Sequence, residues 1–232
     1  MPVGGHTVTS YEQELISLRH MMNEMGGLVV RQTELAIRAI IGADPDAAAQ
    51  ARALDPQVDT LERDVEALAI RLLALRSPMA GDLREIVSAL KVTGDLERIG
   101  DYAASIAKRT LRLGTFMTEI PSAGLRRMAQ LVLENLRDAV AALSTHDSDT
   151  AMRVWRADPA IDEIYTAMFR EFVTYMMEDP RQIGACTNLL FIAKNFERIG
   201  DHATNIAERV HYVVTGEVLP TERPRGTASP QA

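Results

Sequence analysis

Apolar residues recur at helical spacing along most of the chain, and proline and glycine divide it into six long segments. An acceptor side chain followed by proline favours a helix start, because the first helical N–H needs no partner within the helix. Such pairs begin at Asp44, Asp55, Ser77, Asp158 and Asp179. Ser10 and Gln13 have the spacing of a capping box. We therefore predict an all-α fold with helices over residues 10–42, 56–76, 78–113, 123–144, 159–178 and 180–215, and short extra turns at about 46–53 and 149–156.

Two stretches of the sequence are similar to two others about 100 residues further along. The segment "LDPQVDTLER" aligns with "ADPAIDEIYT", and "ERIGD" occurs at 97–101 and again at 197–201. A repeat of this length is too long for a solenoid and indicates a duplicated domain. We expect one three-helix bundle over 10–113 and a second over 122–215, joined at "LGTFMTEIPSAG". Residues 217–232 lack apolar periodicity and are expected to form a disordered tail.

Composition and charge exclude several classes of protein. The 232 residues carry a net charge of −7, and no stretch is basic enough to indicate a nucleic-acid partner. The single cysteine, Cys186, cannot form an internal disulfide, so we expect a buried and inert thiol in a reducing compartment. Neither a secretory signal nor an apolar run of membrane-spanning length is evident, which predicts a cytoplasmic protein.

The repeated "ERIGD" motif places two carboxylates one helical turn apart in an apolar setting. These pairs are Glu97 with Asp101 and Glu197 with Asp201. Like charges at this spacing repel by roughly 0.2–0.5 kcal/mol on a helix. On a helical wheel both pairs fall at the margin of the apolar arc and not on the solvated side. The sequence therefore contains this unfavourable pair of carboxylates twice, and the repetition needs an explanation.

Two explanations compete for these pairs. Each carboxylate could pair with an arginine in a solvated acidic surface, or the two could bind one metal ion from a single helix face. We favour the metal, because the motif is repeated without change. Gly100 and Gly200 support this mildly, since glycine costs helix propensity and admits a close neighbour. Asp59 and Asp162, on the neighbouring predicted helices, are the next candidate ligands.

Other candidate sites are weaker. Glu208 and His211 form one E-x-x-H element, but di-iron bundles use two, so chance is the better explanation. We expect His202 to be a surface histidine. No phosphate-binding glycine loop and no Ser/His/Asp arrangement is present in the sequence.

The segments "MAGDLREIVSALKVTGDLERIGDYAASIAKR" and "LLFIAKNFERIGDHATNIAERVHYVVTGE" resemble the two signature helices of the PhoU family. The resemblance extends over essentially the whole chain and implies a six-helix fold of tandem three-helix bundles. It further implies a cytoplasmic, non-enzymatic negative regulator of phosphate uptake and phosphate-starvation signalling. Its implied partners are the ATPase subunit of the Pst phosphate transporter, a phosphate sensor histidine kinase and a second copy of the chain, with membrane contact only through partners.

Metal binding is also a property that the family resemblance implies. It makes Glu97, Asp101, Glu197 and Asp201 the ligands, and it favours iron or zinc, with magnesium or manganese as alternatives. The halves depart from one another at two places: Ser105 stands where Asn205 keeps the family residue, and Asn195 replaces Asp95. We therefore expect two metal sites that differ. A ferroxidase-like metalloenzyme and a purely structural helical scaffold are the alternative functions.

Overall fold

The computed structural model describes residues 4–113 and 123–220, and within these ranges it contains six long α-helices, one short 3₁₀ turn and no strand. The helices are α1 (Gly4–Gly42), α2 (Pro45–Arg76), α3 (Ala80–Leu113), α4 (Ala123–Thr145), α5 (Ser148–Glu178) and α6 (Ile183–Thr215), and the 3₁₀ turn η2 (Pro180–Gln182) lies between α5 and α6. The predicted all-α fold of six helices is confirmed.

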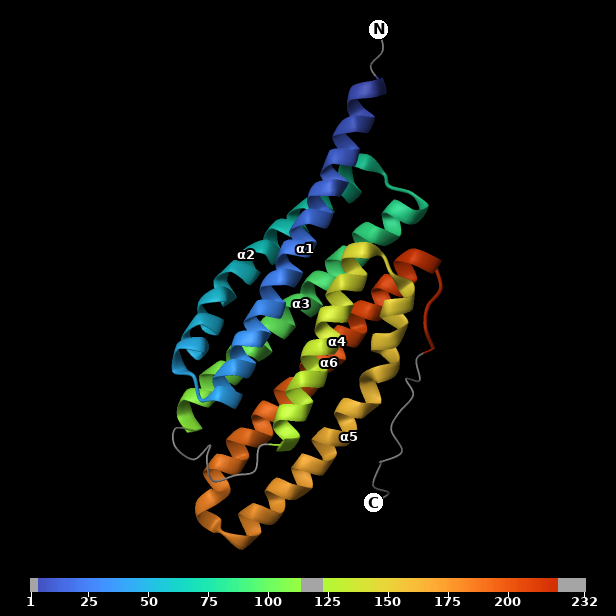
Figure 1. Cartoon of the computed structure of the whole chain (residues 1–232). Helices are drawn as coiled ribbons and strands as arrows, with labels where there is room; N and C mark the ends of the chain where they lie inside the picture. Colours follow the sequence, from blue (N-terminus) through green and yellow to red (C-terminus); the bar gives the residue numbers. More distant parts are fainter. Residues whose placement is uncertain (1–3, 114–122, 221–232) are drawn as a thin grey trace.

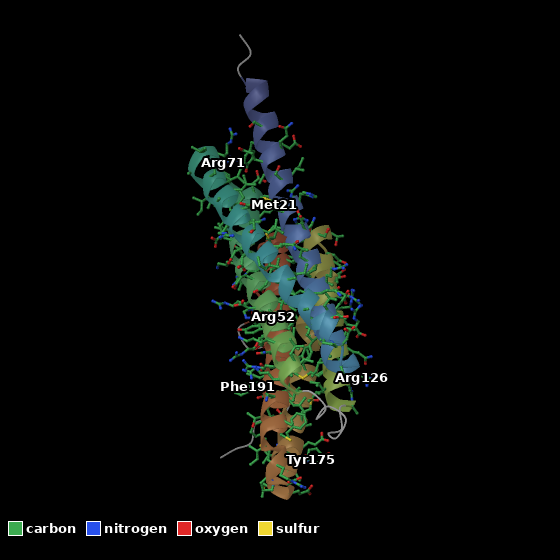
Figure 2. All side chains as sticks on the ribbon, turned by 90° about the vertical axis from the view of Figure 1, so that its left-hand side faces the viewer. Met21, Arg52, Arg71, Arg126, Tyr175 and Phe191 are labelled. Carbon is green, nitrogen blue, oxygen red and sulfur yellow. The ribbon has the colours of Figure 1, made fainter. Side chains whose placement is uncertain are left out.

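The helices form two antiparallel groups of three, as Figure 1 shows. Helices α1, α2 and α3 pack on one another, and α4, α5 and α6 do the same. The groups meet chiefly where α3 lies beside α6, and α1 adds a second contact with α4. The α2–α3 hairpin, near Arg71, and the α5–α6 hairpin, near Tyr175, lie at opposite ends of the elongated molecule (Figure 2).

One apolar core runs through both groups of helices. It contains buried side chains from all six helices, among them Leu18, Met25, Leu72, Ile99, Met128, Phe172 and Phe196. Cys186 belongs to this core, and burial raises the pKa of its thiol, as expected for an inert cysteine. Burial of apolar surface is the main stabilising force in folding. The hydrophobic effect therefore both folds each group of helices and holds the two groups together.

The predicted breaks at the two internal Asp-Pro pairs are wrong. Pro56 lies inside α2 and Pro159 inside α5, so Asp55 and Asp158 are helical residues and not N-caps. Proline within a helix costs about 3 kcal/mol. Packing holds the residues before Pro56 in place, since Ala47, Ala48 and Ala51 are fully buried in a small cluster that also contains Leu35, Ala39 and Ala107. Before Pro159, Ala151 and Val154 are buried in the main core. Tertiary contact therefore keeps each helix continuous through its proline.

Helix starts lie elsewhere than predicted in two further places. Helix α1 begins at Gly4, so Ser10 is inside it and accepts a hydrogen bond from Arg76 (2.9 Å) in place of a capping role. Ser77 has a φ of 47° and ends α2, and α3 begins only at Ala80. The prediction for Asp44 is confirmed, since its carboxylate accepts from the Ala47 N–H at 2.9 Å.

Two more aspartates hold helix ends. Asp179 caps the η2 turn by accepting from the Arg181 N–H. Asp147, which the sequence analysis missed, caps α5 by accepting from the N–H groups of Asp149 and Thr150. The prediction failed there because no proline follows Asp147.

Some predictions fall on parts of the chain that the structure does not describe. The joint between the halves lies mostly in residues 114–122, and most of the tail in residues 221–232. The division into domains at 10–113 and 122–215 stays a prediction. None of the described helices combines the length and the apolarity that a bilayer span requires.

Candidate functional site

The first carboxylate pair lies on α3, on the side that faces α2. Glu97 keeps 21% of its side-chain surface exposed and Asp101 keeps 49%, which agrees with a place at the margin of the apolar arc. Arg98 lies between them, with its Nε 3.5 Å from an oxygen of Glu97 and an Nη 3.8 Å from one of Asp101. Partial burial, and then repulsion from Asp101, raise the pKa of Glu97.

Helix α2 adds further carboxylates to this pair. Burial raises the pKa of Asp55, and the charges of Asp101 and Asp59 raise it further. The pKa of Glu62 is also raised, by burial first and then by Glu66 and Asp59. Asp59 is exposed, but its charge acts on both of its neighbours along α2. The first half therefore concentrates carboxylates between α2 and α3. Because several of them are partly buried and close together, ionising all of them at once is unfavourable.

The second pair has a cation beside it. Lys194 lies 2.5 Å from one oxygen of Glu197, and its ammonium group lies 5.2 Å from the centre of the Tyr165 ring. The other oxygen of Glu197, Oε2, is buried and has no hydrogen-bond partner among the described residues. The residue in the first half that matches Lys194 is Gly94. Both pairs therefore have a cation nearby, but Lys194 lies closer to Glu197 (2.5 Å) than Arg98 lies to Glu97 (3.5 Å). The sequence analysis missed this difference, although residues 94 and 194 already differ in the sequence.

The remaining candidates of the second half have different surroundings. Asp158 is buried and accepts a hydrogen bond from the Thr204 hydroxyl at 2.9 Å. Asp162 is exposed and Asp201 is half-buried. Across residues 4–113 and 123–220, no three side chains of the ligand types His, Cys, Asp and Glu lie close enough together to hold a metal ion. The donor chemistry fits a hard cation, since all six candidates are carboxylates, but side chains would have to converge to bind one.

The glycines of the repeated motif allow the helices to approach closely. A Cβ atom on Gly100 would lie 3.0 Å from the Gln32 side chain and 3.4 Å from Val58. On Gly200 it would lie 2.9 Å from Ile161. The expectation of a close neighbour at both glycines is confirmed, and it places each carboxylate pair against the adjacent helix of its own half.

Comparison with known proteins agrees with this architecture. A sequence model described as "PhoU domain" matches residues 22–110 and again residues 125–210, so the repeat found in the sequence corresponds to two matches of one domain. The chain belongs to the PhoU family. A PhoU homolog of Caulobacter vibrioides, named a phosphate-specific transport system accessory protein, is 48% identical over 225 residues, which cover 95% of this chain and 96% of that protein.

Solved PhoU structures share the fold. The crystal structure of PhoU from Pseudomonas aeruginosa matches with a TM-score of 0.84 and 40% identity, covering 89% of this chain and 100% of that one. The phosphate transport system regulatory protein PhoU from Streptococcus pneumoniae matches with a TM-score of 0.82 and 31% identity, covering 90% and 99%.

The two departures noted in the sequence, Ser105 against Asn205 and Asn195 against Asp95, lie between α3 and α6. Asn205 and His202 of α6 both contact one oxygen of Asp95 on α3, at 3.1 and 2.7 Å. The mirrored contact joins Asn195 to the Ser105 hydroxyl at 3.0 Å. Each departure is therefore compensated by the other across the interface, where these side chains join the halves.

The prediction of a surface position for His202 is wrong. Its side chain keeps only 22% of its surface exposed, and its ring lies 5.7 Å from that of Tyr102, the matching residue of the first repeat. The wheel showed His202 on the polar side of its own helix, but in the tertiary structure α3 covers that side. In the E-x-x-H element, the His211 ring contacts the Ser148 hydroxyl at 2.9 Å.

Proposed function

We propose that this chain is a negative regulator of phosphate uptake and of phosphate-starvation signalling. In this proposal it is a cytoplasmic, non-catalytic and dimeric adaptor between the ATPase subunit of the phosphate-specific transporter and a phosphate sensor histidine kinase. Family membership supports the role, because relatives that match over nearly their whole length are named accessory or regulatory proteins of phosphate transport.

We further propose that the duplicated carboxylate pairs bind metal. Glu97 and Asp101 with Asp59 would hold one ion, and Glu197 and Asp201 with Asp162 would hold another. The observation that carries this proposal is the crowding of partly buried carboxylates between α2 and α3, whose pKa values are raised by burial and mutual repulsion. A cation is the simplest group that offsets such repulsion. The family resemblance favours iron or zinc, while an all-oxygen ligand set also suits magnesium or manganese.

The two sites should differ in strength. Lys194 neutralises part of the charge of Glu197 at 2.5 Å, whereas the first pair has Gly94 at the matching position and only the more distant and more exposed Arg98, at 3.5 and 3.8 Å. An added metal ion therefore relieves more repulsion at Glu97 and Asp101. We expect the first site to bind more tightly, and Lys194→Gly to strengthen the second.

Metal content is the direct test. In a fourfold variant, Glu97 and Glu197 become Gln and Asp101 and Asp201 become Asn, which keeps the shape of each side chain and removes its charge. After loading with ferrous iron or zinc and gel filtration, this variant should contain far less metal than the wild type by elemental analysis. The matched control removes four exposed carboxylates elsewhere: Glu12, Glu24, Asp64 and Asp138. Equal metal content in the two variants would show that the ligands are assigned wrongly.

The regulatory role has a separate test in the bacterium that encodes the chain. Deletion of the gene should derepress phosphate-starvation genes in phosphate-rich medium, and a plasmid copy of the wild type should restore repression. Unchanged reporter output after deletion would contradict the role, whatever the metal content of the purified protein. Sustained catalytic turnover of ferrous iron in stopped-flow assays would instead support the alternative of a ferroxidase-like enzyme.

A further inference from the structure

A pocket unrelated to the carboxylate pairs lies where the two halves of the chain meet. Its volume is about 110 Å³, and α1, α3, α4 and α6 together with His146 line it. One water needs about 10–15 Å³ of such space, so the pocket could hold several waters or one small organic molecule. Its floor is apolar and almost fully buried, formed by Leu18, Met22, Ala89, Val92 and Val210.

The wall of this pocket includes the side chain of Arg209. The Nε of Arg209 is buried and donates to no acceptor among the described residues, and no ion pair within them includes this side chain. The matching residue of the first repeat, Arg109, contacts the Asn188 oxygen at 3.5 Å and lies 4.2 Å from the centre of the Phe191 ring. Buried donors are nearly always satisfied. Four other buried side-chain atoms of the described residues also lack a partner, but of the five only the Nε of Arg209 belongs to a residue that lines this pocket, where a bound molecule can supply the acceptor.

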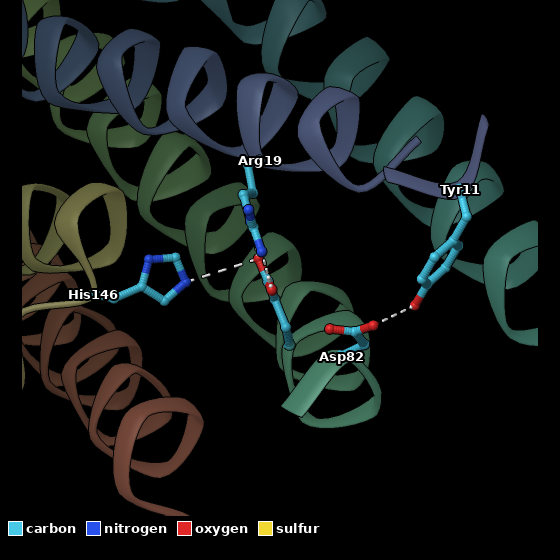
Figure 3. Close-up of polar contacts among 5 residues, drawn as sticks. Tyr11, Arg19, Asp82 and His146 are labelled. Atoms are coloured by element: carbon cyan, nitrogen blue, oxygen red, sulfur yellow. Dashed lines mark hydrogen bonds and ion pairs between the residues drawn. The ribbon is translucent and has the colours of Figure 1, made fainter. Parts of the chain in front are cut away.

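The other charges around the pocket limit what this acceptor can be. Arg19 donates two hydrogen bonds to Glu85, one of them 2.7 Å long, so these two charges cancel. The ring of His146 lies 3.8 Å from one oxygen of the same carboxylate (Figure 3). The arginine and carboxylate side chains of the lining therefore sum to a net charge of +1, from Arg209. A singly charged anion matches this charge, whereas a doubly charged one would leave a negative charge in the pocket without a counterion.

The uncharged groups complete the chemistry of the pocket. The hydroxyl of Ser88, a residue that is 5% exposed, makes no hydrogen bond to any described residue and is available to a ligand. Asn23 and Ser144 are exposed residues of the lining, and their polar groups are also available for hydrogen bonds to a ligand. Bare phosphate would leave the apolar floor unused, whereas a carboxylate with an apolar body would use both parts.

We propose that this pocket binds a small monocarboxylate with an apolar body, whose carboxylate pairs with Arg209 and whose body rests on the floor between α1, α3 and α6. The ligand contacts helices of both halves, so it stabilises their association. This inference does not depend on metal binding or on the regulatory role.

The test titrates the full-length protein with benzoate and hexanoate by calorimetry, with benzyl alcohol and inorganic phosphate as comparison compounds. At least one carboxylate should bind with a dissociation constant on the order of 1 mM or below and raise the Tm. The two comparison compounds should bind at least about tenfold more weakly, because each lacks one half of the recognised chemistry.

Three variants locate the binding. Arg209→Gln should weaken carboxylate binding on the order of tenfold or more, since a charge-assisted hydrogen bond is lost. Arg156→Gln, which removes an exposed arginine on α5, should leave it unchanged. Ser88→Val fills the floor without altering charge and should abolish binding, which keeps the test decisive should Arg209→Gln fail to fold. The proposal is overturned if neither carboxylate binds, if phosphate binds as well as they do, or if Arg209→Gln and Ser88→Val both bind like the wild type.

Discussion

At the scale of single residues, Asp158 shows how a buried carboxylate is kept in a helical core. It is 8% exposed, and the fully buried Thr204 donates to it from the next helix. The matching aspartate of the first repeat, Asp55, accepts instead from Gln32 at 3.2 Å, because alanine stands at the position that matches Thr204. Each half therefore supplies a hydrogen-bond donor to its aspartate, but from a different residue.

Thr204→Val should destabilise the protein by about 1–3 kcal/mol, because it conserves shape and leaves a buried carboxylate with one donor fewer. Thr110→Val is the control, since the Thr110 hydroxyl, also buried, donates only to the Ile106 carbonyl of its own helix. Its loss should cost less than about 1 kcal/mol. Chemical denaturation of both variants measures the difference, and equal losses would show that the bond to Asp158 adds nothing to stability.

At the scale of helices, the α1–α4 contact depends on a glycine. A Cβ on Gly26 would lie 2.8 Å from a methyl group of Val140, whereas one on the adjacent Gly27 would have no atom within 4 Å. Valine is branched at Cβ and cannot move that methyl group easily. Close packing of two helices here leaves no room for even one extra carbon.

Gly26→Ala and Gly27→Ala form a matched pair. Both gain helix propensity, worth up to about 1 kcal/mol, but only Gly26→Ala overpacks a contact, which costs about 1–3 kcal/mol. Gly27→Ala should therefore be neutral or stabilising, and Gly26→Ala should be about 1–3 kcal/mol less stable than Gly27→Ala. Thermal unfolding of the two variants measures this difference. Equal Tm values would show that the close contact between α1 and α4 does not depend on Gly26.

At the scale of the whole molecule, two sets of carboxylates respond to pH with opposite sign. The folded-state pKa values of Asp55, Glu62 and Glu97 are raised, so their ionised forms destabilise the fold at neutral pH. That destabilisation disappears as the pH falls through those raised values. The capping aspartates 44, 147 and 179 have lowered pKa values and contribute stability at neutral pH, which is lost as the pH falls below their ordinary value of 3.8.

The metal-free protein in chelator should therefore gain stability from the first set as the pH is lowered from 7 toward about 4.5. A variant with Asp55→Asn, Glu62→Gln and Glu97→Gln should be more stable than the wild type at pH 7, and the two should converge as the pH approaches this value. Urea unfolding at a series of pH values measures the difference. A difference that stays constant with pH would show that these carboxylates do not repel one another in the folded state.

Features of the fold that depend on local sequence patterns could be predicted, whereas features that depend on contacts between distant residues could not. Helical periodicity and the repeated "ERIGD" are local patterns, and they predicted six helices and the marginal position of the carboxylates. The continuity of α2 and α5 through proline could not be predicted, because it depends on alanines packing against residues far along the chain. For the candidate site, the sequence shows that lysine stands at 194 and glycine at 94, but only the structure shows that the Lys194 ammonium lies 2.5 Å from Glu197.

The sequence by itself determined the all-helical class, the number of long helices, the duplication and the family, because these depend on spacing along one chain. Only the tertiary structure decided which side chains meet between the helices and where a pocket remains. It placed His202 and Asn205 against Asp95, where they join the halves, and it left the Nε of Arg209, beside a pocket, with no acceptor among the described residues. The physical reason is that hydrogen bonds and burial depend on which helices become neighbours, and residues more than 100 positions apart, such as Asp95 and Asn205, meet only after the whole chain has packed.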